Sequence, residues 1–115
     1  KVGISVKEIF QESLKLCKEY NYNFAFPCNI SINSIAAHDS AYENYILDEN
    51  DMVKIDFGIE KDGIILDSAI TIDLSGERYE YIELALKCLE IAKECIFSNK
   101  TIYEYQKEIQ NFLKD

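Results

Sequence analysis

Proline, glycine and long apolar runs are all scarce in this chain. It has one proline and four glycines among 115 residues, whereas 48% of the residues are hydrophobic and 29% are charged. Such a composition is typical of a globular domain and excludes a collagen-like or long disordered segment. No apolar run is long enough to span a bilayer, and the first residues lack the charged and then apolar layout of a signal peptide. We therefore expect a cytoplasmic protein that does not bind membranes.

Positive charge is also in short supply. The chain has 12 Lys and Arg residues against 21 Asp and Glu residues, which gives a formal net charge of −9. Binding to the phosphate backbone of nucleic acids depends on clustered Lys and Arg side chains. The charge therefore argues against a nucleic acid as a direct partner.

The cysteines do not form a recognisable metal or redox motif. No CxxC spacing occurs among the four of them, and they are too few for the dense disulfide framework of a small secreted domain. We interpret them as reduced and mostly packed thiols: Cys17, Cys28, Cys88 and Cys95.

The length of the chain indicates one domain or a part of one. The sequence has no initiating Met and enters a helical pattern almost at once, as a segment cut from a longer polypeptide would. We expect residues 1–115 to form a single unit.

Three helices are predicted. Apolar residues recur at every third or fourth position from Ser5 to Tyr20 and again from Arg78 to Phe97. Thr101 and Glu104 have the spacing of a capping box, which predicts a last helix that extends to Leu113. In the second helix the residues expected to face the core are Ile82, Ala85, Leu86, Leu89, Ala92 and Ile96.

The segment between the first two helices has the pattern of extended chain, loop and hairpin. Residues 24–37 are predicted to be extended, with a kink at Pro27. Residues 39–51 are polar and aperiodic, which indicates a surface loop with a solvated acidic end at residues 48–51. Two strands follow, Met52–Glu60 and Ile64–Asp73, joined by a dipeptide that favours a tight hairpin turn, Asp62-Gly63.

The predicted turn determines how the two strands pair. With Asp62-Gly63 at the centre of the turn, Asp56 lies opposite Ala69. Asp67 then lies opposite Gly58. Side chains directly opposite each other, or two residues apart on one strand, share a face of the sheet. Both aspartates are therefore expected on one face as diagonal neighbours, about 7–8 Å apart at the backbone, with an apolar face behind them.

These patterns alone do not predict an enzyme. Aspartates on the open face of a hairpin usually face water. The single histidine, His38, would ordinarily be a hydrogen-bonded loop residue.

Four short motifs, taken in order, resemble a known family. They contain Phe26-Pro27, His38 after two alanines, Asp56 in KIDFG, and Asp67 in ILDSAITID. Their order and spacing resemble the amino half of type 2 methionine aminopeptidases, which are metallopeptidases with the pita-bread fold. The short leading segment is more similar to archaeal members than to animal ones. The resemblance implies an α/β (α+β) fold in which helices back an antiparallel hairpin sheet, with residues 1–115 as the amino-terminal half of the catalytic domain.

The resemblance also implies roles for individual residues. Asp56 would chelate one divalent ion and Asp67 would bridge two, the ions being Co, Mn, Fe or Zn. His38 would contact the substrate and steady the tetrahedral intermediate as a hydrogen-bond donor, without being a metal ligand. Phe26 would form part of the apolar wall that accepts a methionine side chain. The substrate would be a peptide or nascent protein that begins with methionine.

One departure from the family pattern is large. The family completes its metal centre with one histidine and two glutamates from its carboxyl half. This sequence has no histidine after Asp67, and its glutamates from Glu77 to Glu108 fall in helical patterns. We therefore expect the isolated chain to be inactive and to need the missing carboxyl half as a partner.

Two other interpretations stay open. A non-catalytic pita-bread module would bind peptides or partner proteins, as proliferation-associated and histone-chaperone relatives do. Such relatives generally lack the metal ligands, so the presence of His38, Asp56 and Asp67 favours the enzyme. An unrelated acidic α/β interaction domain would require the motif match to be accidental.

Overall fold

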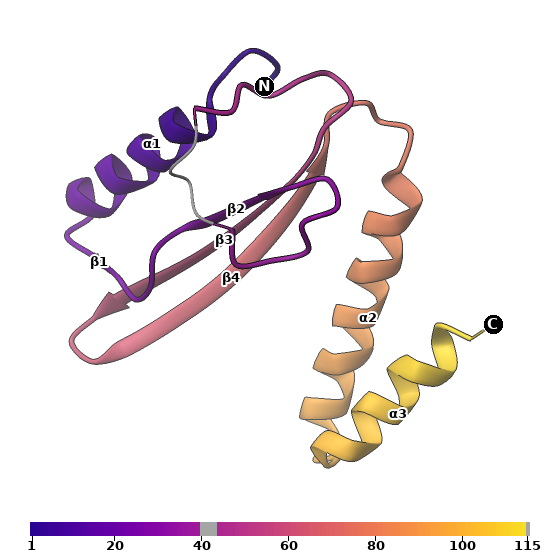
Figure 1. The fold of residues 1–115 in the computed structure, drawn as a ribbon. Helices are drawn as coiled ribbons and strands as arrows, with labels where there is room; N and C mark the ends of the chain where they lie inside the picture. The colour runs from indigo at the N-terminus through magenta and orange to yellow at the C-terminus, as the bar shows by residue number, and fades with distance from the viewer. Residues whose placement is uncertain (40–43, 115) are drawn as a thin grey trace. The chain divides into compact units, whose positions relative to one another are not determined.

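The computed structural model describes residues 1–39 and 44–114, which divide into two compact units, Lys1–Glu77 and Arg78–Asp115. The first unit is a helix and an antiparallel sheet, and the second is a pair of helices (Figure 1). The predicted α/β class with an antiparallel hairpin sheet is confirmed. The elements in chain order are α1 (Val6–Glu19), β1 (Asn23–Phe24), β2 (Asn29–Ile32), β3 (Met52–Lys61), β4 (Ile64–Asp73), α2 (Tyr79–Phe97) and α3 (Ile102–Phe112).

Strand β3 is the centre of the sheet. One edge of β3 pairs along its whole length with β4. The other edge pairs with β2 and, further along the strand, with β1. The turn between β3 and β4 has φ of 54° at Asp62 and 82° at Gly63. Positive φ at both central residues is the property of a type I′ turn, whose twist matches that of the flanking strands. The predicted turn and strand register are therefore confirmed.

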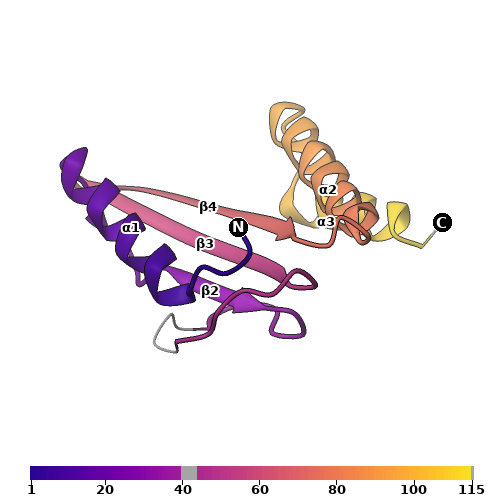
Figure 2. The same cartoon turned by 90° about the horizontal axis from the view of Figure 1, so that it is seen from above.

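Helix α1 packs against the apolar face of this sheet (Figure 2). It begins at a capping box in which Ser5 and Glu8 bond each other's backbone amides. Phe24 is 6.0 Å from the ring of Phe10 and 5.2 Å, edge to face, from the ring of Phe57. The buried residues of this core are Val6, Cys28, Ile30, Leu47 and Val53.

The predicted extended segment is confirmed only in part. Residues 29–32 form β2, but the chain then turns at Asn33, which has a φ of 51°. The Asn33 side chain accepts a hydrogen bond from the Met52 amide at 2.9 Å and donates one to Asp51 at 2.8 Å. These two side-chain hydrogen bonds stabilise the turn at Asn33, and the strand therefore ends before it.

The loop prediction for residues 39–51 is wrong at its carboxyl end. Asp51 is only 3% exposed, whereas a solvated acidic run was expected. Its carboxylate accepts hydrogen bonds from Asn33 Nδ2 at 2.8 Å, from the Tyr45 hydroxyl at 3.1 Å and from the Asp48 amide at 2.8 Å. A buried carboxylate that lost these hydrogen bonds would destabilise the folded state. The three bonds therefore hold this part of the loop in place. Residues 40–43 of the predicted loop lie outside the described part of the chain.

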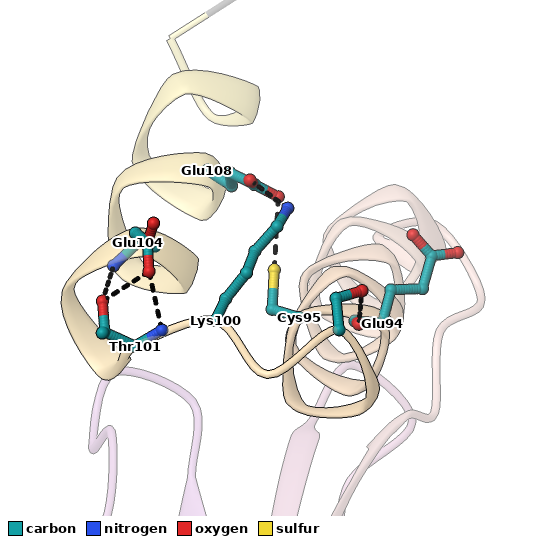
Figure 3. Close-up of polar contacts among 7 residues, drawn as sticks. Glu94, Cys95, Lys100, Thr101, Glu104 and Glu108 are labelled. Carbon is teal, nitrogen blue, oxygen red and sulfur yellow. Dashed lines mark hydrogen bonds and ion pairs between the residues drawn. The ribbon is translucent and has the colours of Figure 1, made fainter.

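The second unit is held together by contacts between α2 and α3. Cys95 Sγ donates to Glu108 Oε2 at 3.2 Å, and the Lys100 ammonium pairs with the same carboxylate (Figure 3). The predicted capping box of Thr101 and Glu104 opens α3 (Figure 3).

The core face predicted for α2 is covered only in part, with Ile82 and Ala92 partly buried. Leu86, Leu89 and Ile96 are 49%, 51% and 67% exposed, whereas Cys95 is 1% exposed. Periodicity identified an apolar helix correctly, but the position of α3 determines which side of the helix is covered.

All four cysteines are free thiols, and three of them are buried, in agreement with the sequence interpretation. None of the described helices combines the length and the apolar character needed to cross a membrane.

The sheet core makes a clear prediction for stability. We expect Ile30→Ala to lower the free energy of unfolding by about 2–5 kcal/mol, because a fully buried side chain is replaced by a cavity. The matched control Ile46→Ala, at a position that is 62% exposed, should change it by less than about 0.5 kcal/mol. Urea unfolding followed by circular dichroism measures both, and equal losses would contradict the described core.

Candidate functional site

The hairpin brings Asp56 and Asp67 to one face of the sheet. Asp56 pairs with Ala69, and Asp67 pairs with Gly58. In an antiparallel ladder paired residues project to the same side, as do residues two apart on one strand. The carboxylates therefore stand diagonally across the two strands, as the turn predicted, on the face opposite α1.

The two carboxyl groups are close enough to influence each other's charge. Partial burial raises the pKa of Asp56 above its ordinary value of 3.8, and the negative charge of Asp67 and a hydrogen bond between the two carboxyls raise that pKa further. Asp56 is half-buried and Asp67 is exposed. Like charges held this close disfavour the doubly ionised state, and a divalent cation between them would remove that penalty.

His38 lies near this pair but does not complete a ligand cluster. Its charged form opposes the rise in the Asp56 pKa, which places it within electrostatic range of that carboxyl. The histidine is exposed and has a φ of 64°, a left-handed conformation that few non-glycine residues adopt. Among residues 1–39 and 44–114, no group of three or more His, Cys, Asp or Glu side chains could hold a metal ion.

The backbone next to His38 is tied to β2. The Ile30 amide donates to the Asp39 carbonyl at 3.2 Å, and the Asp39 amide donates to Ser31 Oγ at 3.3 Å. Ser31 is 2% exposed, so this anchor is shielded from water. Sequence reasoning did not single out Ser31. Its position two residues after Asn29, on the polar face of β2, was the signal that could have identified it.

Phe26 lies on the same face as the two aspartates. Its ring occupies the place that a Cβ atom of Gly58 would take, and Gly58 is two residues from Asp56 and opposite Asp67. The structure thus brings Phe26, Asp56 and Asp67 to one face of the hairpin and His38 within electrostatic range of Asp56, although the four residues come from four separate motifs.

The two aspartates fit part of a site for divalent metal ions. Carboxylate oxygens suit hard or borderline divalent ions, and the hydrogen-bonded pair offers oxygens from both strands of a rigid hairpin. Two carboxylates supply too few ligands for a closed site, because dinuclear centres draw ligands from several elements. Any metal centre that includes these two carboxylates would therefore need ligands from other residues as well.

Comparison with known proteins identifies the family of the chain. The sequence model of metallopeptidase family M24 matches residues 1–115. The chain is 33% identical to a methionine aminopeptidase of Pyrococcus horikoshii over 99% of its length, and 36% identical to one of Archaeoglobus fulgidus over 95%. It is also 39% identical to methionine aminopeptidase 2 of Encephalitozoon hellem over 76% of its length.

The chain covers only a part of each of these relatives. It spans 39% of the Pyrococcus protein, 38% of the Archaeoglobus protein and 26% of the Encephalitozoon protein. The similarity therefore bears on one portion of a longer sequence.

The charge pair predicts how stability depends on pH in the metal-free chain. When folding raises the pKa of an acid, the free energy of unfolding falls as pH rises above the pKa of that acid in the unfolded chain. The fall is complete once pH exceeds the pKa in the folded state. Asp67→Asn removes the neighbouring charge, so we expect higher stability than wild type at pH 7 and a difference that shrinks as pH falls toward 3.8.

Asp62→Asn is the matched control, because it removes the same charge from the same hairpin at a turn position that favours Asn. Urea midpoints from pH 3 to pH 7 test the expectation. A pH-independent effect of Asp67→Asn, or an equal effect of Asp62→Asn, would exclude repulsion between the two carboxylates.

Proposed function

The chain belongs to metallopeptidase family M24, and we propose that it is the amino-terminal half of the catalytic domain of a type 2 methionine aminopeptidase. In this proposal the complete protein removes the initial methionine from peptides and nascent proteins. The observation that supports it most strongly is the pair Asp56 and Asp67 on one face of the hairpin, next to His38 and Phe26. The names of the archaeal relatives support the same activity.

The metal ions would be held by the two aspartates. Asp56 would chelate one divalent ion, and Asp67 would bridge that ion and a second one. Bound there, the ions would supply Lewis-acid activation of water and of the scissile carbonyl. Carboxylate ligands are compatible with Co, Mn, Fe or Zn.

Two further side chains would bind and orient the substrate. His38 would donate a hydrogen bond to the peptide, and its anchored backbone at Asp39 would limit its movement. Phe26 would provide one wall for the methionine side chain, since its ring lies on the face where the aspartates stand. Orientation of this kind lowers the entropic cost of reaching the reactive geometry.

The remaining groups would come from the portion of the relatives that this chain does not span. By the family resemblance, one histidine and two glutamates would complete the centre, and the sequence after Asp67 has no histidine. Residues 1–115 would therefore act as a unit only together with that carboxyl half. A substrate that is a nascent protein places the proposed activity in the cytoplasm, where free thiols such as those of this chain are stable.

The proposal predicts weak metal binding by the 115-residue chain. Calorimetric titration with Mn²⁺ should show at most one equivalent, because the missing ligands would otherwise contribute both affinity and orientation. Asp56→Asn and Asp67→Asn should each weaken binding by about tenfold or more, whereas Asp62→Asn should leave it unchanged. Tight binding of two equivalents would mean that other residues of this chain complete the site.

The proposal also predicts where activity resides. Release of methionine from a Met-Ala-Ser peptide should be absent with the 115-residue chain and present with the complete polypeptide, since only the latter would have a full metal centre. Asp67→Asn in the complete polypeptide should lower kcat/KM by about a hundredfold or more, and Asp62→Asn should have no effect. Turnover by the 115 residues alone would refute the half-site proposal, and full activity of the Asp67→Asn enzyme would refute the role of that residue.

A further inference from the structure

Gly58 has no conformational reason to be glycine. It lies in the middle of β3, and its φ is not among the positive values found at Gly3, Gly63 and Gly76. A glycine inside a strand weakens that strand and often marks a place where another group approaches the backbone closely. The reason for glycine at this position must therefore come from its surroundings.

The surroundings of Gly58 are occupied by the ring of Phe26. A Cβ atom placed on Gly58 would stand 2.2 Å from Cε1 of Phe26 and 2.7 Å from both Cδ1 and Cζ. Carbon atoms that are not bonded to each other have their optimal separation at about 3.5–4.0 Å, so a side chain at residue 58 and the ring in this position exclude each other. Gly58 is accordingly buried although its strand neighbours are only partly so.

The path of the chain explains why the ring lies there. Phe24 pairs with Ile59, and Asn29 pairs with Asp56, so the four residues 25–28 face only residues 57 and 58 of β3. Two extra residues in one strand make a bulge, and bulges change the direction in which a side chain points. Pro27 belongs to this bulge and has no amide hydrogen to donate to the ladder.

The ring stands on the face of the sheet where the metal ligands would be. A Cβ atom at residue 58 would project to the same face of the sheet as the side chain of Asp56, which is two residues away. The side chain of Asp67, which pairs with residue 58, projects to that face as well. Gly58 thus leaves the space that the Phe26 ring occupies, and any larger residue would displace the ring from this position against the sheet.

We propose that Gly58 is a positioning residue that acts through Phe26 to set the depth of the pocket for the substrate's first side chain. This inference depends on the proposed aminopeptidase function. A ring this close to the backbone would leave room for a long unbranched apolar side chain, such as that of methionine. A ring raised by a methyl group at residue 58 leaves room only for a shorter one.

The kinetic test uses the complete polypeptide. Gly58→Ala should raise KM for Met-Ala-Ser about tenfold or more while kcat changes less, because the pocket is reduced and the metal ligands are unchanged. The penalty should be much smaller for Ala-Ala-Ser, whose first side chain is short. Adding Phe26→Leu to Gly58→Ala should recover most of the lost affinity for the methionine peptide, since a smaller side chain fits above the new methyl group.

A structural readout separates this inference from the proposed function. In the NMR spectrum of the 115-residue chain, the Gly58 Hα resonances should lie upfield because an aromatic ring covers them, and Phe26→Leu should remove the shift. Ile59→Val, a loss of one methyl group on the opposite face of the same strand, is the control for general destabilisation and should leave both the shift and the peptide preference unchanged.

Each outcome supports or overturns the inference. Unshifted Gly58 resonances, a parallel loss of activity toward both peptides, or failure of Phe26→Leu to rescue would overturn it. A complete wild-type polypeptide that releases no methionine would overturn the proposed function instead, and with it the link from Gly58 to a substrate pocket, while the NMR result would still decide where the ring lies.

Discussion

The pairing of β3 with β4 is the constraint on which the rest of the first unit depends. Each of the ten residues of β3 has a partner in β4, and the Asp62-Gly63 turn fixes that pairing through its positive φ values. A shift of one residue would turn every side chain of one strand to the other face of the sheet. The apolar core and the pair Asp56 and Asp67 would then be lost together, so stability and the candidate site have a common origin.

The two faces of this sheet have opposite physical requirements. The face under α1 is apolar and packs aromatic rings such as Phe24 and Phe57. The other face has two features that a structure selected only for stability would avoid, namely two neighbouring carboxylates and a glycine inside a strand, and His38, within electrostatic range of Asp56, is a non-glycine residue at positive φ. Local costs of this kind concentrate at functional sites, where the surrounding structure holds them in place.

The M24 family model matches residues 1–115, and this match is the background against which the aspartate pair is interpreted. The chain spans 39% of the Pyrococcus relative, and in the proposed function the two carboxylates would form only one side of a metal centre. The rigid hairpin would present Asp56 and Asp67 to ligands from the rest of the protein. The bulge at residues 25–28 and the anchor at Ser31 would place the substrate-contacting side chains beside them.

The sequence by itself determined the features that depend on near neighbours along the chain. The turn at Asp62-Gly63 and hence the facing of Asp56 and Asp67 follow from local backbone preferences, as does the capping box at Thr101. Motif order was enough to indicate the family. Only the tertiary structure decided that Asp51 is buried, that α3 covers Cys95 of α2 rather than Leu89, and that the Phe26 ring lies against Gly58. Each of these three features depends on contacts between residues that are distant in the chain. Packing and burial determine such contacts, and the periodicity of one segment does not predict them.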